Sequence, residues 1–212
     1  MKNIELFLGR LQPPHNGHKK IIDGMKNPVV VIVKGKKSGE DLARNPLDEE
    51  YQVKLMKMIF PDIPISISPN GFLPGILGYL RKQGMETTKI YAGADRIASY
   101  KEAINKANET MPEQYPRYNV VFQETERVTS ATAVRNAIKS GDIQTFRKLV
   151  PQAIWGEWDT LRQKLNAANE GTLRFSQWMK EEESVTTTDN IKDAQRDLPL
   201  GPIVRRKKIK KR

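Results

Sequence analysis

Short apolar runs alternate with amphipathic segments over the first three quarters of the chain. A continuous apolar run such as 29–33 is typical of a strand covered on both faces, because neither face of such a strand meets water. Apolar residues three and four positions apart, as in 51–59, indicate a helix with one buried face. We expect strands at 4–8, 29–33, 63–68, 89–92 and 119–123. We expect helices at 18–25, 48–59, 76–84, 95–107, 130–138 and 155–168. This alternation predicts an α/β fold with a Rossmann-like, doubly wound, five-stranded parallel sheet.

The junction between the first strand and the first helix is rich in polar and rigid residues. It reads GRLQPPHNGH over residues 9–18 and contains both histidines of the chain, His15 and His18. Amide groups at a helix start favour an anion, Gly17 lets a ligand approach the backbone closely, and imidazole rings can donate to phosphate oxygens. A lone histidine is more often a helix cap or a solvated side chain. Two histidines and a glycine in one loop favour a phosphate site.

Polar residues also follow the second and fourth strands. The sequence KGKKSG follows the second strand, and GADR at 93–96 follows the fourth. Ligands of open α/β sheets bind beyond the carboxyl ends of the strands. The candidate nucleotide- or phosphate-binding residues here are therefore Lys36, Lys37, Gly93 and Asp95. Solvated lysines and a helix cap at Asp95 are alternatives of similar weight.

The composition is that of a globular protein with a basic end. A chain of 212 residues with 38% hydrophobic residues can bury one core and carry an appendage. The formal charge is +11, but seven of these positive charges lie in 205–212, which leaves +4 for the remainder. The absence of cysteine excludes disulfides, thiolate metal sites and cysteine nucleophiles. No apolar run approaches the roughly 20 residues of a membrane span, and no signal peptide is evident, so we expect a soluble, cytoplasmic protein without a membrane partner.

Two separated motifs resemble those of one enzyme family. The segment GRLQPPHNGH resembles the GRFQPxHxGH form of the HxGH signature of nucleotidyltransferases, which are related in fold to class I aminoacyl-tRNA synthetases. Leu11 stands where an aromatic residue is common, which affects packing more than chemistry. The segment 129–135 resembles the second signature of the family, ISxTxxR. With NPL at 45–47 and GADR at 93–96, the chain looks most similar to the small adenylyltransferases of nicotinamide-nucleotide metabolism and their phage-encoded homologues.

The resemblance covers roughly residues 1–155, and it implies both topology and chemistry. The implied strand order is 3-2-1-4-5, with the loop of the first strand at the switch point. The implied reaction transfers a nucleoside monophosphate, AMP from ATP rather than CMP from CTP, to a phosphorylated acceptor and releases pyrophosphate. Nicotinamide mononucleotide is the leading acceptor and would give NAD. We expect Mg²⁺ to accompany ATP, held by the nucleotide and water rather than by a protein metal site.

The same resemblance implies roles for individual residues. His15 and His18 would donate to phosphate oxygens, and Arg135 would grip the leaving pyrophosphate. Arg10 would anchor the acceptor or the triphosphate, with a structural ion pair as the alternative. The remaining phosphate-binding positions are Gly9, Gly17, Ser130 and Thr132. Taken alone, the hydroxyls of Ser130 and Thr132 are better explained as helix caps.

The last quarter of the chain differs in composition. We expect a nucleotidyltransferase domain at 1–155, a helical extension at 156–183 and a flexible, disordered basic tail at 184–212. The tail would contact a protein or a nucleic acid, or remain solvated. This extension supports an alternative function, a binding or assembly protein of nucleotidyltransferase fold, such as a phage structural component, acting in the host cytoplasm. A fragment of an aminoacyl-tRNA synthetase is disfavoured, because the chain has no evident room for a tRNA-binding domain. The oligomeric state stays open, a homo-oligomer included.

Overall fold

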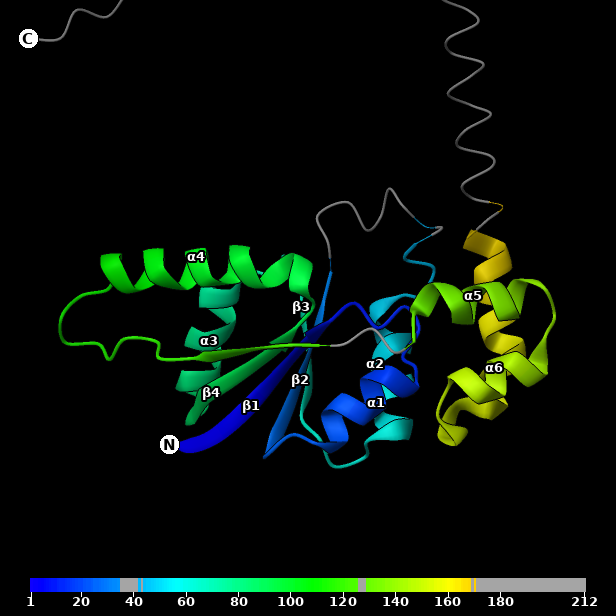
Figure 1. Cartoon of the computed structure of the whole chain (residues 1–212), viewed down its shortest axis with the longest axis horizontal. Helices are drawn as coiled ribbons and strands as arrows, with labels where there is room; N and C mark the ends of the chain where they lie inside the picture. Colours follow the sequence, from blue (N-terminus) through cyan, green and yellow to red (C-terminus); the bar gives the residue numbers. More distant parts are fainter. Residues whose placement is uncertain (35–41, 43, 126–128, 169, 171–212) are drawn as a thin grey trace, which may run out of the picture. The chain divides into compact units, whose positions relative to one another are not determined.

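The structure, a computed structural model, describes residues 1–34, 42, 44–125, 129–168 and 170. One compact unit runs from Met1 to Leu173, and the second unit, Arg174–Arg212, lies outside the described residues. The described strands form one parallel sheet in the order β3-β2-β1-β4-β5 (Figure 1). The bounds are Lys2–Gly9 for β1, Pro28–Val33 for β2, Ile65–Ser68 for β3, Met85–Ala92 for β4 and Val121–Glu124 for β5. The predicted Rossmann-like class and strand order are confirmed.

Helices cover both faces of the sheet, as the continuous apolar strands require. The helices are α1 at Asn16–Asp23, α2 at Glu49–Ile59, α3 at Leu73–Lys82 and α4 at Ala94–Thr110. Alternate residues of β1 point to opposite faces. Leu6 packs in one hydrophobic cluster with α3 and α4, whereas Phe7 packs in another with α1 and α2. The sheet is therefore doubly wound, and its core lies on both sides of the central strand β1.

The ends of several elements differ from the sequence-based expectation. The expected strand at 63–68 begins only at Ile65, because Pro64 has no N–H to donate, although its carbonyl oxygen accepts from Val30 N–H at 3.0 Å. Strand β4 begins four residues earlier than expected, through the polar sequence METT, because it pairs with the start of β1. Helix α1 begins inside the histidine motif, at Asn16, rather than at its end.

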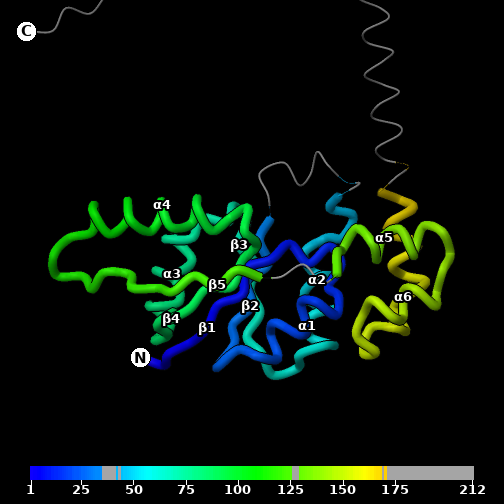
Figure 2. The backbone as a smooth tube through the Cα atoms, in the orientation of Figure 1, coloured from blue at the N-terminus to red at the C-terminus, as the bar shows by residue number. Residues whose placement is uncertain are grey.

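A third group of helices follows the sheet. It consists of α5 at Ala131–Lys139, α6 at Ile143–Leu149, a 3₁₀ turn at Gln152–Glu157 and a helical stretch at 158–168. Helix α6 is not among the expected helices. Leu161 and Leu165 are buried in one cluster with α5, α6 and the Tyr51 face of α2. Figure 2 shows the backbone of this helical stretch beside α5 and α6. Helix α2 is thus packed between the sheet and these helices, which fixes the start of α5 relative to the sheet.

Some sequence-based expectations concern parts of the chain outside the described residues. These are Lys36 and Lys37, the end of the helical extension, and the basic tail. The boundaries proposed at 155 and 183 stay predictions. Within the described ranges, no helix combines the length and the apolar character needed to cross a bilayer.

Candidate functional site

A pocket lies at the carboxyl ends of β1 and β4, where the strand order reverses. Loops from these strands lead into α1 and α4, and the start of α5 forms a further wall. The cavity measures about 480 Å³. Ten of the twelve residues predicted for the site line it: Gly9, Arg10, His15, Gly17, His18, Gly93, Asp95, Ser130, Thr132 and Arg135. The other two, Lys36 and Lys37, lie outside the described residues. The structure therefore brings together residues that are more than a hundred positions apart in the sequence.

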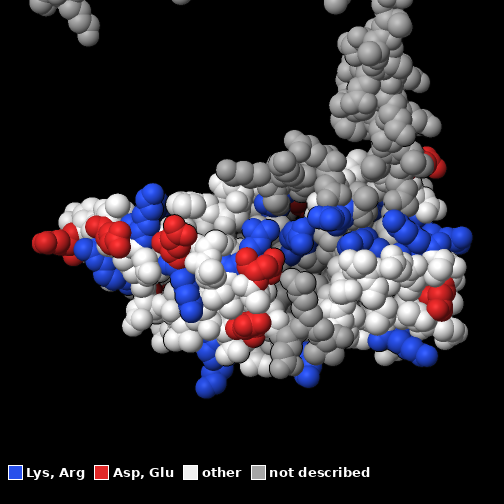
Figure 3. All heavy atoms as spheres, turned by 45° about the horizontal axis from the view of Figure 1, so that its top comes forward, with Lys and Arg blue, Asp and Glu red and all other residues white. Residues whose placement is uncertain are grey.

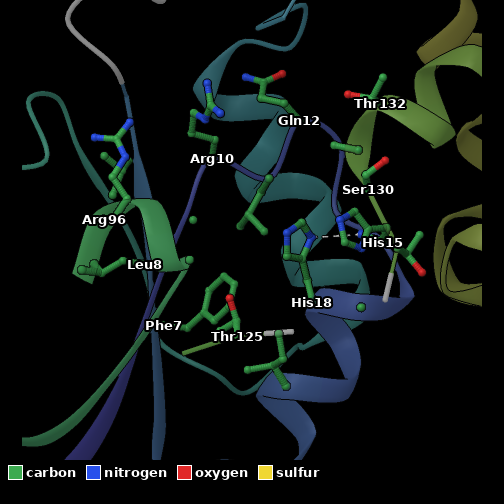
Figure 4. Close-up of a pocket in the computed structure, with 18 of the residues that line it drawn as sticks. Phe7, Leu8, Arg10, Gln12, His15, His18, Arg96, Thr125, Ser130 and Thr132 are labelled. Atoms are coloured by element: carbon green, nitrogen blue, oxygen red, sulfur yellow. Dashed lines mark hydrogen bonds between the residues drawn. The ribbon is translucent and has the colours of Figure 1, made fainter. Parts of the chain in front are cut away.

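The two histidine rings form a stacked pair at the start of α1. Their centroids are 3.7 Å apart with an interplanar angle of 23° (Figure 4). The backbone N–H of His15, the N-cap residue, donates to Nδ1 of His18 at 3.2 Å. Nδ1 of His18 consequently carries a lone pair, and the neutral ring carries its proton on Nε2. The N-cap contact thus leaves Nε2–H as the donor that His18 can offer to a ligand.

Burial keeps the ring of His15 neutral as well. Its side chain is only 6% exposed, and its Nδ1 finds no hydrogen-bond partner in the part of the chain that the structure describes. A proton on this buried nitrogen would have no acceptor, which favours the tautomer protonated on Nε2. Burial lowers the pKa of His15 from 6.5 to about 4. Burial, and next the proximity of His15, lower the pKa of His18 well below 6.5. Both rings are therefore neutral donors at pH 7.

Gly17 makes room for this arrangement. A Cβ atom at this position would lie 3.0 Å from both Cε1 and Nδ1 of His15. That separation is tighter than nine in ten real Cβ contacts, so a side chain here would shift the His15 ring by a few tenths of an ångström. The glycine of the HxGH sequence thus favours the observed packing of the His15 ring at the start of α1.

The second motif lies at the start of α5. Ser130 is the N-cap, and its Oγ accepts from the N–H of Ala133 at 3.1 Å. The guanidinium of Arg135 donates to Thr132 Oγ1 at 3.1 Å and to the carbonyl oxygen of Gln12 at 2.6 Å. The hydroxyl of Ser130 caps the helix, as expected from the residues alone. The same turn directs Arg135 toward the loop of residues 9–18 that contains both histidines, called the histidine loop below.

Gln12 connects that loop to the segment before α2. Its side-chain Nε2 donates to Leu47 O at 2.9 Å, and its Oε1 accepts from Leu47 N–H at 3.0 Å. Arg44, three residues before Leu47, lines the pocket. Neither Gln12 nor Arg44 is among the residues predicted from the sequence. Gln12 lies within the GRLQPPHNGH motif, which could have indicated it, and the NPL segment at 45–47 is the nearest signal to Arg44.

The charge of the pocket is strongly positive. Four arginines line it, Arg10, Arg44, Arg96 and Arg135, whereas Asp95 is the sole carboxylate among its described lining residues. Asp95 forms an exposed ion pair with Arg96 at 3.8 Å. Figure 4 shows Arg96 across the cavity from the histidines, and Figure 3 shows Lys and Arg side chains in a row across one face of the molecule. Such a pocket is suited to ligands with several negative charges.

Comparison with known proteins does not identify a family. No protein-family model matches the sequence, and no curated protein matches it. Among solved structures, the chain is similar to the crystal structure of Thermotoga maritima TmcAL bound with alpha-thio ATP, with a TM-score of 0.48 and 14% sequence identity. The match covers 79% of this chain and 56% of TmcAL, so the chain spans little more than half the length of that protein. A likeness at this level concerns the path of the chain alone.

Proposed function

We propose that the protein is a nucleotidyltransferase that transfers AMP from ATP to a phosphorylated acceptor and releases pyrophosphate. The observation that carries the proposal is one cavity lined by two neutral histidines, the starts of α1 and α5, and four arginines. Helix starts and guanidinium groups bind phosphates, and the volume of about 480 Å³ is in the range of small-molecule sites. The resemblance to the HxGH motif assigns this set of residues to nucleotidyl transfer.

The reaction requires the protein to position the two reactants and to stabilise the charge that develops in the transition state. An oxygen of the acceptor phosphate forms a bond to the α-phosphorus of ATP, the bond from this phosphorus to the β-phosphate oxygen breaks, and pyrophosphate leaves with the electron pair. No protein nucleophile takes part. Orientation of the two anions and donors aimed at the developing charge lower the barrier.

Each motif has a part in this scheme. The Nε2–H groups of His15 and His18 donate to phosphate oxygens around the reacting phosphorus. Arg135, anchored on Gln12 O and Thr132, binds the leaving pyrophosphate. Arg10, which forms no hydrogen bond or ion pair within the described residues, is available for the second anion.

A magnesium ion is compatible with these residues. Mg²⁺ is commonly held by one or two carboxylates, substrate phosphates and water. Asp95 is the carboxylate that lines the pocket, and the described residues contain no group of three or more metal-ligating side chains. The ion would therefore be held mainly by the triphosphate and water, and it would neutralise phosphate charge there.

The acceptor and the nucleotide are proposed from sequence resemblance. Nicotinamide mononucleotide is the first choice because the SATAVR and GADR sequences resemble those of enzymes of nicotinamide-nucleotide metabolism. ATP, rather than CTP, rests on the same resemblance. Both choices are open to direct measurement.

The test is pyrophosphate release by the purified full chain with Mg²⁺, ATP or CTP, and a panel of phosphorylated acceptors. His18→Ala removes both the cap acceptor and the Nε2–H donor. His18→Asn retains an acceptor near the Nδ1 position and removes only the donor. We expect both variants to lose about 10²–10³-fold in rate, as for the loss of one oxyanion donor. Lys20→Ala, an exposed change on the same helix and away from the pocket, should retain the full rate.

Recovery of the full rate in His18→Asn would assign His18 a purely structural role. Absence of pyrophosphate release with every nucleotide and acceptor, for a folded protein, would count against the proposed reaction.

A further inference from the structure

The start of α4 forms a wall of the pocket, with Arg96 across the cavity from the histidine pair (Figure 4). The lining residues of this wall are Gly93, Asp95, Arg96 and Tyr100. The N-cap Gly93 has no capping side chain, whereas Ser130 caps α5. The first turn of α4 therefore presents N–H groups that no N-cap side chain uses. Neither Arg96 nor Tyr100 is among the residues predicted from the sequence.

The hydroxyl of Tyr100 is an unused polar group at this wall. Tyr100 is only 8% exposed, and its side chain packs in one cluster with Leu8 and Ala92. Its hydroxyl forms no hydrogen bond within the part of the chain that the structure describes. Side chains on a helix lean toward its N-terminus, so this hydroxyl points toward the first turn of α4 and the pocket. Because a buried tyrosine hydroxyl usually has a partner, the free one indicates a bound ligand.

Arg96 presents its charge beside this hydroxyl. It lies one helical turn before Tyr100, so the two side chains share a face of α4. Its Nε is 3.8 Å from Oδ2 of Asp95, which is an ion pair at the surface but too long for a hydrogen bond. No other side chain among the described residues accepts a hydrogen bond from this guanidinium. Its N–H groups are therefore available to a ligand.

These donors define the chemistry of the ligand. Burial raises the pKa of Tyr100, Arg96 opposes this shift and Asp95 adds to it, so the hydroxyl keeps its proton at pH 7 and can donate. A guanidinium, a hydroxyl and a helix start are donors with which proteins bind phosphate. A phosphate monoester offers three terminal oxygens to these three donors, whereas a carboxylate offers two.

We propose that Arg96, Tyr100 and the first turn of α4 form a second anion-binding site in the pocket, the α4 anion site, which binds a phosphate group of the acceptor. The assignment to the acceptor rests on the proposed function. The triphosphate of ATP is placed there at the histidines and Arg135, and adenosine carries no charge. The acceptor class is therefore a molecule with two separate phosphate groups. One attacks the α-phosphorus, and the other is held at α4, where no bond changes.

The experiment uses inorganic phosphate as the probe and the full chain labelled with ¹⁵N. We expect millimolar phosphate to shift the backbone amide resonances of Ala94 and Asp95 and the Nε resonance of Arg96 in a saturable way. Arg96→Gln should weaken binding at these amides by about tenfold or more, as for a hydrogen bond to a charged group. Tyr100→Phe removes only the hydroxyl and should weaken it by about fivefold.

Two matched variants control for general effects on charge and structure. Lys101→Gln removes an exposed positive charge from α4, and Tyr79→Phe removes the hydroxyl of an exposed tyrosine on α3. Both should bind phosphate as the original protein does. The thermal unfolding midpoint of Tyr100→Phe should stay unchanged, because the buried ring is retained. Equal phosphate binding in the original protein, Arg96→Gln and Tyr100→Phe would overturn the proposal, as would the absence of any shift at α4.

Asp95 gives a test in which the expected effect has the opposite sign. Its carboxylate repels an anion bound beside Arg96, so Asp95→Asn should tighten phosphate binding by about threefold or more. A ligand that donates to this carboxylate, such as a sugar diol, would instead require it. Weaker phosphate binding in Asp95→Asn would contradict an anion site at this position.

Two further measurements assign the site to the acceptor. A non-hydrolysable ATP analogue should leave the phosphate shifts at α4 in place, and loss of these shifts would assign the site to the nucleotide instead. In the presence of the analogue, fructose 1,6-bisphosphate should bind at least about tenfold more tightly than fructose 6-phosphate, and Arg96→Gln should remove the difference. Equal binding of the two sugars to the original protein would overturn the proposed acceptor class.

These outcomes are independent of turnover. Pyrophosphate release without phosphate binding at α4 leaves the proposed reaction intact and overturns the α4 anion site. Phosphate binding that depends on Arg96 and Tyr100, without pyrophosphate release for any acceptor, supports the α4 anion site and counts against the proposed reaction.

Discussion

The low pKa values of the stacked histidines predict a specific loss of stability in mild acid. A histidine whose pKa is lower in the folded than in the unfolded chain binds fewer protons when folded. Stability is then full above the unfolded pKa of 6.5 and decreases as the pH falls from that value toward the folded pKa. For His15, with a folded pKa of about 4, linkage gives a loss of about 2 kcal/mol between pH 7 and pH 5. The lowered pKa of His18 acts in the same direction.

The composition makes this effect measurable. The chain has two histidines and no cysteine, so no other side-chain type has its ordinary pKa in this interval. Carboxyl groups act at lower pH. The pKa of Glu157, for example, is lowered by its hydrogen bond from Lys54, and its contribution is lost only below its ordinary value of 4.5. The histidine pair therefore contributes most of the change between pH 7 and pH 5.

The assay is urea unfolding followed by tryptophan fluorescence at pH 7, 6 and 5. We expect the free energy of unfolding to fall by about 2 kcal/mol or more in the original protein. It should change little over the same range in the double variant His15→Gln/His18→Gln, which has no group titrating there. Lys20→Ala, on the same helix, should retain the pH dependence. Equal pH dependence in the original protein and the double variant would refute the burial of neutral rings in this site.

Two further substitutions test the packing around the histidine loop. Gly17→Ala places a Cβ 3.0 Å from the His15 ring, so the rate of pyrophosphate release should fall at least about tenfold while the unfolding midpoint changes little, since alanine favours the helix. Gly24→Ala, where the nearest atom is 3.5 Å away, is the matched control, and an equal rate for the two variants would contradict the steric argument. Gln12→Ala removes both hydrogen bonds to Leu47 and should lower the free energy of unfolding by about 2 kcal/mol in urea titrations. The exposed change Gln123→Ala should leave it unchanged, and a similar result for both glutamines would show that the Leu47 pairing is dispensable.

The strands of the sheet could be predicted because each one gives a recognisable pattern within its own few residues of sequence. Each buried parallel strand needs a continuous apolar run, and each run here is separated from the next by a helix pattern or a turn. The errors arise where tertiary contacts outweigh this signal. The polar start of β4 is a strand because β1 pairs with it, and the seven-residue α6 was not predicted because its one fully buried side chain, Phe146, gives no periodic pattern.

The candidate site was predictable as a set of motifs but not as a geometry. The histidine loop and the α5 motif each have a recognisable sequence, and both line the pocket. The pairing of Gln12 with Leu47, 35 residues away, has no local sequence signature. The stacking of His15 on His18 likewise depends on the φ and ψ angles of the N-cap residue.

The contacts of Gln12 also bear on the order of events in folding. This residue joins the loop after β1 to Leu47 through its side chain and to Arg135 through its carbonyl oxygen, across sequence separations of 35 and 123 residues. The contact with Arg135 spans more of the chain than the pairing of Lys2 with Met85 in the sheet, so its closure costs more conformational entropy and we expect it to form later. The strands and helices can therefore be largely in place while the pocket is still incomplete. During refolding, recovery of pyrophosphate affinity would then lag behind recovery of the far-ultraviolet circular dichroism signal, and ligand affinity would report on the last stage of assembly.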